Sequence, residues 1–254
     1  MKFTYEDLIS GDSIYVQGLG HFRSPLLEEI KPTKGIGAWT YNLYLNLLSW
    51  DKNEYLSFFK ETIGRRAKIL SKNEKLGVFD MVTVIESSRE LLQKAMAFFM
   101  DEKLSWDEKE RAFYTSSKTD EELVGRIDRN NFEEVRDMML QMNYINVGES
   151  AKPLKHSSAA AQELWERAQQ YLKEESTKAT PDKNMNLGNI ISKLCAANTG
   201  YTLLNIYNLT VFQLYDQFFQ YGYLRAMNLN EMAFSNHGGK DFDMRAWLKP
   251  IIKI

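Results

Sequence analysis

The chain has 254 residues, of which 44% are hydrophobic and 13% aromatic, so it can bury one large core or two smaller ones and is not a disordered tail. Its formal net charge of −2 argues against a global attraction to nucleic acid or anionic lipid. Cys195 is the single cysteine, which excludes an intramolecular disulfide and a cysteine-rich zinc site and suits a reducing cytoplasm.

The first residues of the chain carry Glu6 and Asp7 where a signal peptide needs a basic segment followed by an apolar one. No window approaches the run of about eighteen uncharged apolar residues that a membrane span requires. We therefore expect neither export nor a membrane partner.

Two short β-prone stretches flank Gly18 and Gly20 and predict a hairpin over residues 13–23. Pro25 then opens a short helix up to Ile30, because its missing N–H would be unpaired at a helix start anyway.

Helical periodicity begins at Trp39, and four apolar residues spaced i, i+3, i+4 and i+7 share one face: Tyr41, Tyr44, Leu45 and Leu48. Asp51 and Glu54 have the spacing of a capping box, which predicts a new helix from residue 52 to about residue 72. We expect one further long helix over residues 76–100.

Residues 101–131 give a mixed signal. The spacing of Ser105 and Glu108 resembles another helix start, whereas 112–115 and 123–127 read as strands and predict a second hairpin near 112–127. An amphipathic helix should follow over residues 132–142. Its Met138, Met139 and Met142 suit either a core or an adaptable partner surface.

The polar composition of residues 149–186 predicts a linker that contains one alanine-rich helix, at 159–173. A compact apolar stripe follows from Leu187 to Cys195. Thr210 and Gln213 then mark the start of a last long helix, which should end before Gly238 and Gly239.

The predicted fold class is therefore mainly α, a helical bundle with one or two small β-hairpins near 13–23 and 112–127. We expect an N-terminal hairpin and helical region (1–148), the linker with one helix (149–186) and a C-terminal helical region (187–254). The last region either stands alone or forms one continuous domain with the first.

No pattern of catalytic or metal-binding residues emerges from the sequence. The three histidines, His21, His156 and His237, are far apart in predicted turns or polar loops and read as surface residues. Cys195 lies on an apolar stripe without a neighbouring base, so we interpret it as structural.

Glycine pairs offer no better site. Gly18 and Gly20 precede a strand instead of a helix, so they predict a turn and not a dinucleotide site. The loop 237–243 contains Lys240, Asp241 and Asp243 but lacks phosphate-loop spacing and has too few carboxylates for a cation site. Carboxylates such as Glu86 and Glu90 could form an enzyme site with Asp241 or Asp243 only by convergence in space. We expect no catalytic residue, no cofactor and no metal.

Aromatic residues are dense in the C-terminal helices and cannot all lie on one helical face. Either the last helix is buried all round, or part of it is exposed and binds a partner protein. The residues we expect at such a partner surface are Phe212, Tyr215, Phe219, Tyr223, Arg225 and Trp247.

Four segments resemble proteins encoded in tail modules of phages and prophages of Gram-positive bacteria. They are IYVQGLGHFRSPLLEEI (14–30), YNLYLNLL (41–48), TVFQLYDQF (210–218) and DMRAWLKP (243–250). The nearest family is the phage tail assembly chaperones, which are mainly helical, non-catalytic proteins that bind the tape-measure protein and help the tail tube to polymerise.

This resemblance implies a non-catalytic tail assembly chaperone that binds tape-measure or tail-tube protein in the bacterial host cytoplasm. Two alternatives stay open. One is a nucleic-acid-binding regulatory or replication module that contacts phosphates through Arg65, Arg66, Lys68 and Lys72. The other is a virus-encoded inhibitor of a host defence protein.

Overall fold

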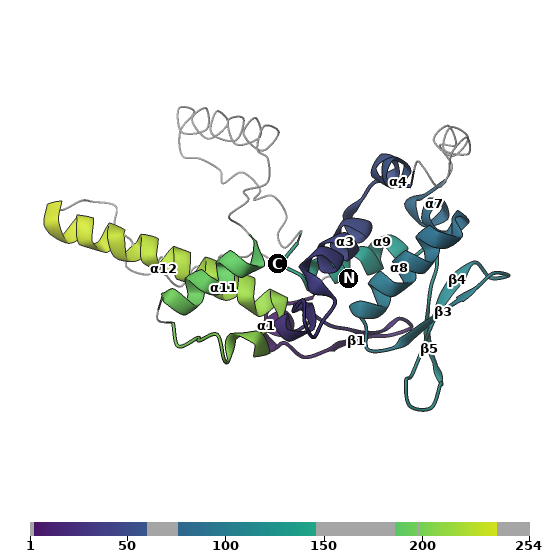
Figure 1. Ribbon diagram of the computed structural model, residues 1–254, viewed down its shortest axis with the longest axis horizontal. Coiled ribbons are helices and arrows are strands. Elements are labelled where there is room, and N and C mark those ends of the chain that lie inside the picture. Colours follow the sequence, from purple (N-terminus) through teal and green to yellow (C-terminus); the bar gives the residue numbers. More distant parts are fainter. Residues whose placement is uncertain (1–2, 60–75, 146–185, 198, 238–254) are drawn as a thin grey trace. The chain divides into compact units, whose positions relative to one another are not determined.

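The computed structural model describes residues 3–59, 76–145, 186–197 and 199–237 (Figure 1). Contacts divide the chain into two compact units. The first unit contains residues 1–146 and 205–216, and the second contains 147–204 and 217–254. The expected linker lies outside the described residues except for Asn186. Residues 205–216, which the sequence placed with the C-terminal region, belong to the first unit.

The predicted N-terminal hairpin is confirmed. A short helix α1 (Tyr5–Ser10) precedes strands β1 (Ile14–Val16) and β2 (Gly20–Phe22), which pair antiparallel with Tyr15 opposite His21. The hairpin turn adjoins the second sheet, because the carbonyl of Gly18 accepts from the Arg126 N–H at 3.0 Å. Gly18 thus lies in the predicted turn, and Gly20 is the first residue of β2 directly after it.

The second sheet has three antiparallel strands in the order β3 (Lys103–Asp107), β4 (Ala112–Ser116) and β5 (Leu123–Ile127). The hairpin of β4 and β5 is confirmed. The helix start expected at Ser105 is wrong, because this segment is strand β3. The Asp107 carboxylate does accept backbone N–H groups, from Lys109 at 2.8 Å and Glu110 at 2.9 Å, but in a turn between strands.

Two helices follow the first hairpin and the short helix α2 (Leu27–Ile30). In α3 (Gly37–Ser49) the buried residues are Tyr41, Tyr44, Leu47 and Leu48, so Leu47 takes the core place that periodicity gave to Leu45. Helix α4 (Lys52–Phe58) begins at the predicted capping box, in which the Asp51 carboxylate accepts from the Glu54 N–H at 2.9 Å.

The prediction of one long helix over 76–100 is wrong in one respect. The segment forms two helices, α7 (Val78–Val84) and α8 (Glu86–Phe98). Ile85 separates them in an extended conformation, with φ −105° and ψ 116°. The break ends a run of four β-branched residues, 82–85, whose stiff side chains weaken helix formation.

Helix α9 (Phe132–Gln141) packs against α3, which also contacts α8, and these helices lie together in Figure 1. Met138, Met139 and Met142 are fully or almost fully buried, so they belong to the core and not to an adaptable surface. Arg136 is buried as well and donates to the carbonyls of Leu48 and Trp50 at the end of α3. It satisfies acceptors that a helix end leaves open.

The C-terminal part contains α11 (Leu187–Ala196), a 3-10 turn (Ile206–Asn208) and α12 (Val211–His237). The predicted start of α12 is confirmed, because the Gln213 N–H donates to Thr210 Oγ1 and the Thr210 N–H donates to Gln213 Oε1. Val211–Asp216 belongs to the first unit, where the Val211 N–H donates to the Pro25 carbonyl.

The fold is thus mainly α with two small antiparallel sheets. The bundle arrangement stays a prediction. Among the described helices, none is both long and apolar enough to cross a membrane.

Candidate functional site

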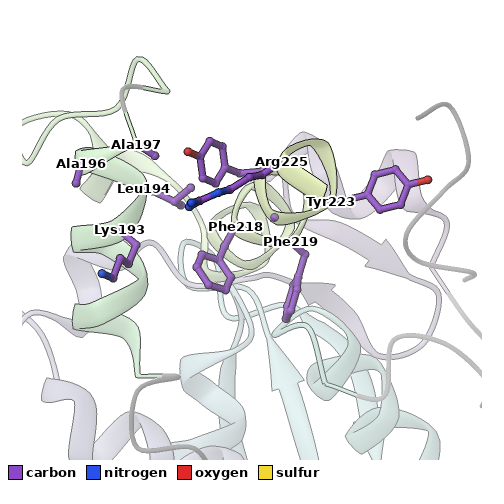
Figure 2. Close-up of a pocket in the computed structure, with 10 residues that line it drawn as sticks. Lys193, Leu194, Ala196, Ala197, Phe218, Phe219, Tyr223 and Arg225 are labelled. Carbon is purple, nitrogen blue, oxygen red and sulfur yellow. The ribbon is translucent and has the colours of Figure 1, made fainter. Parts of the chain in front are cut away.

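The second unit contains a groove between α11 and the part of α12 that follows residue 217, with a volume of about 730 Å³. Figure 2 shows its two walls and the labelled side chains between and around them. The lining residues are Lys193, Leu194, Ala196, Ala197, Phe218, Phe219, Tyr221, Gly222, Tyr223 and Arg225.

Helix α11 is fixed at both ends by side-chain caps. The Asn186 carboxamide oxygen accepts from the Asn189 N–H at 2.9 Å, and Thr199 Oγ1 donates to the Leu194 carbonyl at 3.0 Å. The predicted apolar stripe is present, with Ile190, Ile191 and Leu194 buried. The groove edge of α11 is formed by Lys193 and the small side chains of Ala196 and Ala197, which leave room beside the helix.

The wall formed by α12 follows from helical spacing. Phe218, Gly222 and Arg225 lie at i, i+4 and i+7 and therefore share one face. Arg225 reaches from this face toward Leu194 of α11, whereas Tyr223 projects away from α11 (Figure 2). Apart from the adjacent residues and backbone of α12 itself, no atom of the described residues lies within 4 Å of the place where a Cβ at Gly222 would stand. Close packing therefore does not explain the glycine, which instead opens the groove down to the backbone.

The groove combines an apolar surface with positive charge. Aromatic rings and alanines supply most of its lining, and the charged residues among the ten are Lys193 and Arg225, both exposed. Neither forms an ion pair with another residue in the described parts of the chain. The site therefore offers apolar contacts and two cations to a ligand.

Three of the six residues predicted for a partner surface, Phe219, Tyr223 and Arg225, are among those that line the groove, and the Tyr223 ring projects away from α11. The prediction for Phe212 needs correction, because its ring is fully buried in the first unit, 5.1 Å from the ring of Tyr144. Tyr215 stacks on the same Tyr144 at 5.8 Å, and burial raises its pKa. Trp247 lies outside the described residues.

Burial differs between the two parts of α12, and partner binding by the exposed part stays a prediction. Val211, Phe212 and Leu214 are buried, while from Phe218 onward the described side chains are half-buried or exposed. Sequence reasoning missed Lys193, Phe218 and Gly222. A glycine within a long helical pattern is the signal that could have drawn attention to this face.

The other candidate residues do not assemble into a site. His21 lies in strand β2 and not in a loop, with its side chain 46% exposed and bound to Glu102, and His237 is the last residue of α12. Cys195 is half-buried on α11. Glu86 and Glu90 are exposed on α8.

The remaining predicted positions, His156, the basic run 65–72 and residues 238–243 of the glycine loop, lie outside the described part. Within that part, no group of three or more His, Cys, Asp or Glu side chains could hold a metal ion.

A protein-family comparison bears on this unit. The family model described as the YomV second domain matches residues 177–252, a range that includes every residue lining the groove. YomV is a gene of Bacillus phages and prophages. The match, which covers residues 177–252 alone, supports a phage-derived origin. No curated protein and no solved structure gives a significant match.

Proposed function

We propose that this phage-derived chain is a non-catalytic assembly protein that holds a segment of another phage protein in the α11–α12 groove. The observation that carries this proposal is the groove itself. It has a volume of about 730 Å³, and its lining is mostly apolar and aromatic with two exposed cations. Apolar surface rimmed by polar groups is typical of protein-binding sites, and aromatic residues and arginine dominate binding energy at such sites.

The more specific proposal is a tail assembly chaperone that binds tape-measure or tail-tube protein in the cytoplasm of the bacterial host. It is supported by the resemblance of four segments to phage tail-module proteins, whereas the family match over the groove supports only a phage origin. Aromatic rings and alanines dominate the described lining of the groove, and such a surface suits holding a ligand.

The test is co-purification of the tagged full-length chain from cells in which the phage is replicating. We expect tape-measure or tail-tube protein to be recovered with the wild type and with Gly222→Ala, and to be lost with Gly222→Trp. The tryptophan fills the groove from a helix position with open space around its Cβ, so the fold should tolerate it. Circular dichroism would verify that the variant is folded.

Other outcomes would overturn the proposal. Recovery of a host defence enzyme in place of a virion protein would favour the inhibitor alternative. Retention of the tail protein by Gly222→Trp would show that the groove is not its binding site. Failure to recover either tail protein with the wild type would contradict the chaperone assignment.

A further inference from the structure

We infer that the groove between α11 and α12 recognises one kind of partner segment: an amphipathic α-helix with acidic side chains beside its apolar ridge. This inference rests on the proposed function, because it specifies the segment that the groove holds. Two helices already form the walls, and a third helix laid between them would bury its apolar face as in other helix-in-groove complexes.

The apolar part of the recognition would centre on Gly222. An added Cβ there would meet no described atom outside the adjacent part of α12 within 4 Å, and Gly222 is exposed, so the α12 backbone is accessible between Phe218 and Arg225. A branched or aromatic side chain of the partner can occupy this gap and contact the Phe218 ring. Glycine in the interior of a helix lowers helix stability. Access of a ligand to the backbone would explain why a glycine stands at this position.

The charged part would come from Lys193 on one wall and Arg225 on the other. Both side chains are exposed, and neither has a carboxylate partner among the described residues. A helix that lies between the walls can offer Glu or Asp on either side of its apolar ridge. A basic helix would place like charges together at both positions, so the cations select against it.

The experiment measures binding of three fluorescein-labelled model peptides to the full-length chain by fluorescence anisotropy. The first is an amphipathic helix with glutamates flanking a leucine ridge. The second has lysines in place of the glutamates, and the third has the composition of the first with the leucines spread around the helix. We expect the acidic amphipathic peptide to bind about tenfold more tightly than either of the others at low salt.

The matched variant is the double charge reversal Lys193→Glu and Arg225→Glu. Because both residues are exposed, the fold should be retained, which circular dichroism would verify. We expect this variant to prefer the lysine peptide over the glutamate peptide, and we expect Gly222→Trp to weaken binding of the preferred peptide at least tenfold. Higher salt should reduce the difference between the acidic and basic peptides.

Equal affinity for acidic and basic peptides, or an unchanged preference in the charge-reversed variant, would overturn the inference. So would equal affinity for the peptide with scattered leucines, or no binding of any peptide to the wild type. If co-purification of a tail protein still depended on the groove in those cases, the proposed function would stand and only the helix assignment would fail. If co-purification did not depend on the groove but peptide selectivity were retained, the helix assignment would stand and the proposed function would fail.

Discussion

The carboxylate of Glu102 binds the backbone of His21 at the junction of the N-terminal hairpin and the three-stranded sheet. The His21 N–H lies 2.8 Å from Oε1 and 2.9 Å from Oε2, and the imidazole Nδ1 lies 2.7 Å from Oε1. Glu102 is only 5% exposed, so it is a buried charged group satisfied mainly by one backbone amide and one ring. This contact joins segments that are far apart in the chain.

Replacing Glu102 with alanine should therefore lower the free energy of unfolding by about 2–3 kcal/mol, because the His21 N–H loses its charged acceptor. His21→Ala should cost less than about 1 kcal/mol, since it removes an exposed ring and leaves the backbone contact in place. Urea denaturation of both variants measures the difference. Equal losses would show that the ring, and not the backbone amide, carries the interaction.

Gly20 is the second component of the same junction. Its φ is +120°, and a Cβ there would stand 2.6 Å from Glu102 Cδ. Gly18 also has a positive φ, +76°, but open space around its Cβ position. We expect Gly18→Ala to cost about 1 kcal/mol of stability from backbone strain, and Gly20→Ala to cost clearly more because strain and a clash combine. Equal melting temperatures of the two variants would contradict the described contact.

Tyr41 should make the protein sensitive to alkali. Its hydroxyl donates to Asn143 Oδ1 at 2.9 Å in the core, and burial raises its pKa well above the usual value. The folded state thus favours the neutral phenol, so this stabilisation is fully present below about pH 10 and is lost as the pH rises toward the folded-state pKa.

We expect the free energy of unfolding to fall as the pH rises above about 10, and to fall less in Tyr41→Phe. At neutral pH the same variant should be about 1–2 kcal/mol less stable, because Asn143 Oδ1 loses its donor. Tyr15→Phe is the control, since Tyr15 is 54% exposed. An identical alkaline fall in wild type and Tyr41→Phe would disprove the role of Tyr41.

Gly222→Ala should increase stability, in contrast to the substitutions above. The position is in the interior of α12 with nothing near its Cβ, so alanine adds helix propensity without a clash. The expected gain is about 1 kcal/mol, measurable by thermal or urea unfolding. A loss of stability would mean that the glycine has a structural role that its open surroundings do not indicate.

Local patterns in the sequence predicted the helix starts well. The pairs Asp51 with Glu54 and Thr210 with Gln213 each mark a real helix start, because capping depends on residues a single turn apart. The hairpin turn at Gly18 and the strands at 112–116 and 123–127 were predictable for the same reason: turn and strand preferences are local.

Features set by distant contacts were not predictable. The segment 103–107 becomes a strand because it pairs with 112–116, which overrides its resemblance to a helix cap. Phe212 looks like its exposed aromatic neighbours in sequence, yet it packs into the first unit beside Tyr144. The groove is lined by residues of both α11 and α12, and no local sequence pattern connects Lys193 of one helix with Gly222 of the other.

Site-specific photo-crosslinking in phage-producing cells tests groove binding most directly. A photoreactive phenylalanine analogue would replace Phe218 in the groove or, as the control, Leu224 in the same helix, which is 45% exposed and does not line the groove. We predict an adduct with tape-measure or tail-tube protein from position 218 and little or none from position 224. Equal adducts from both positions, or an adduct from position 224 alone, would contradict binding in the α11–α12 groove.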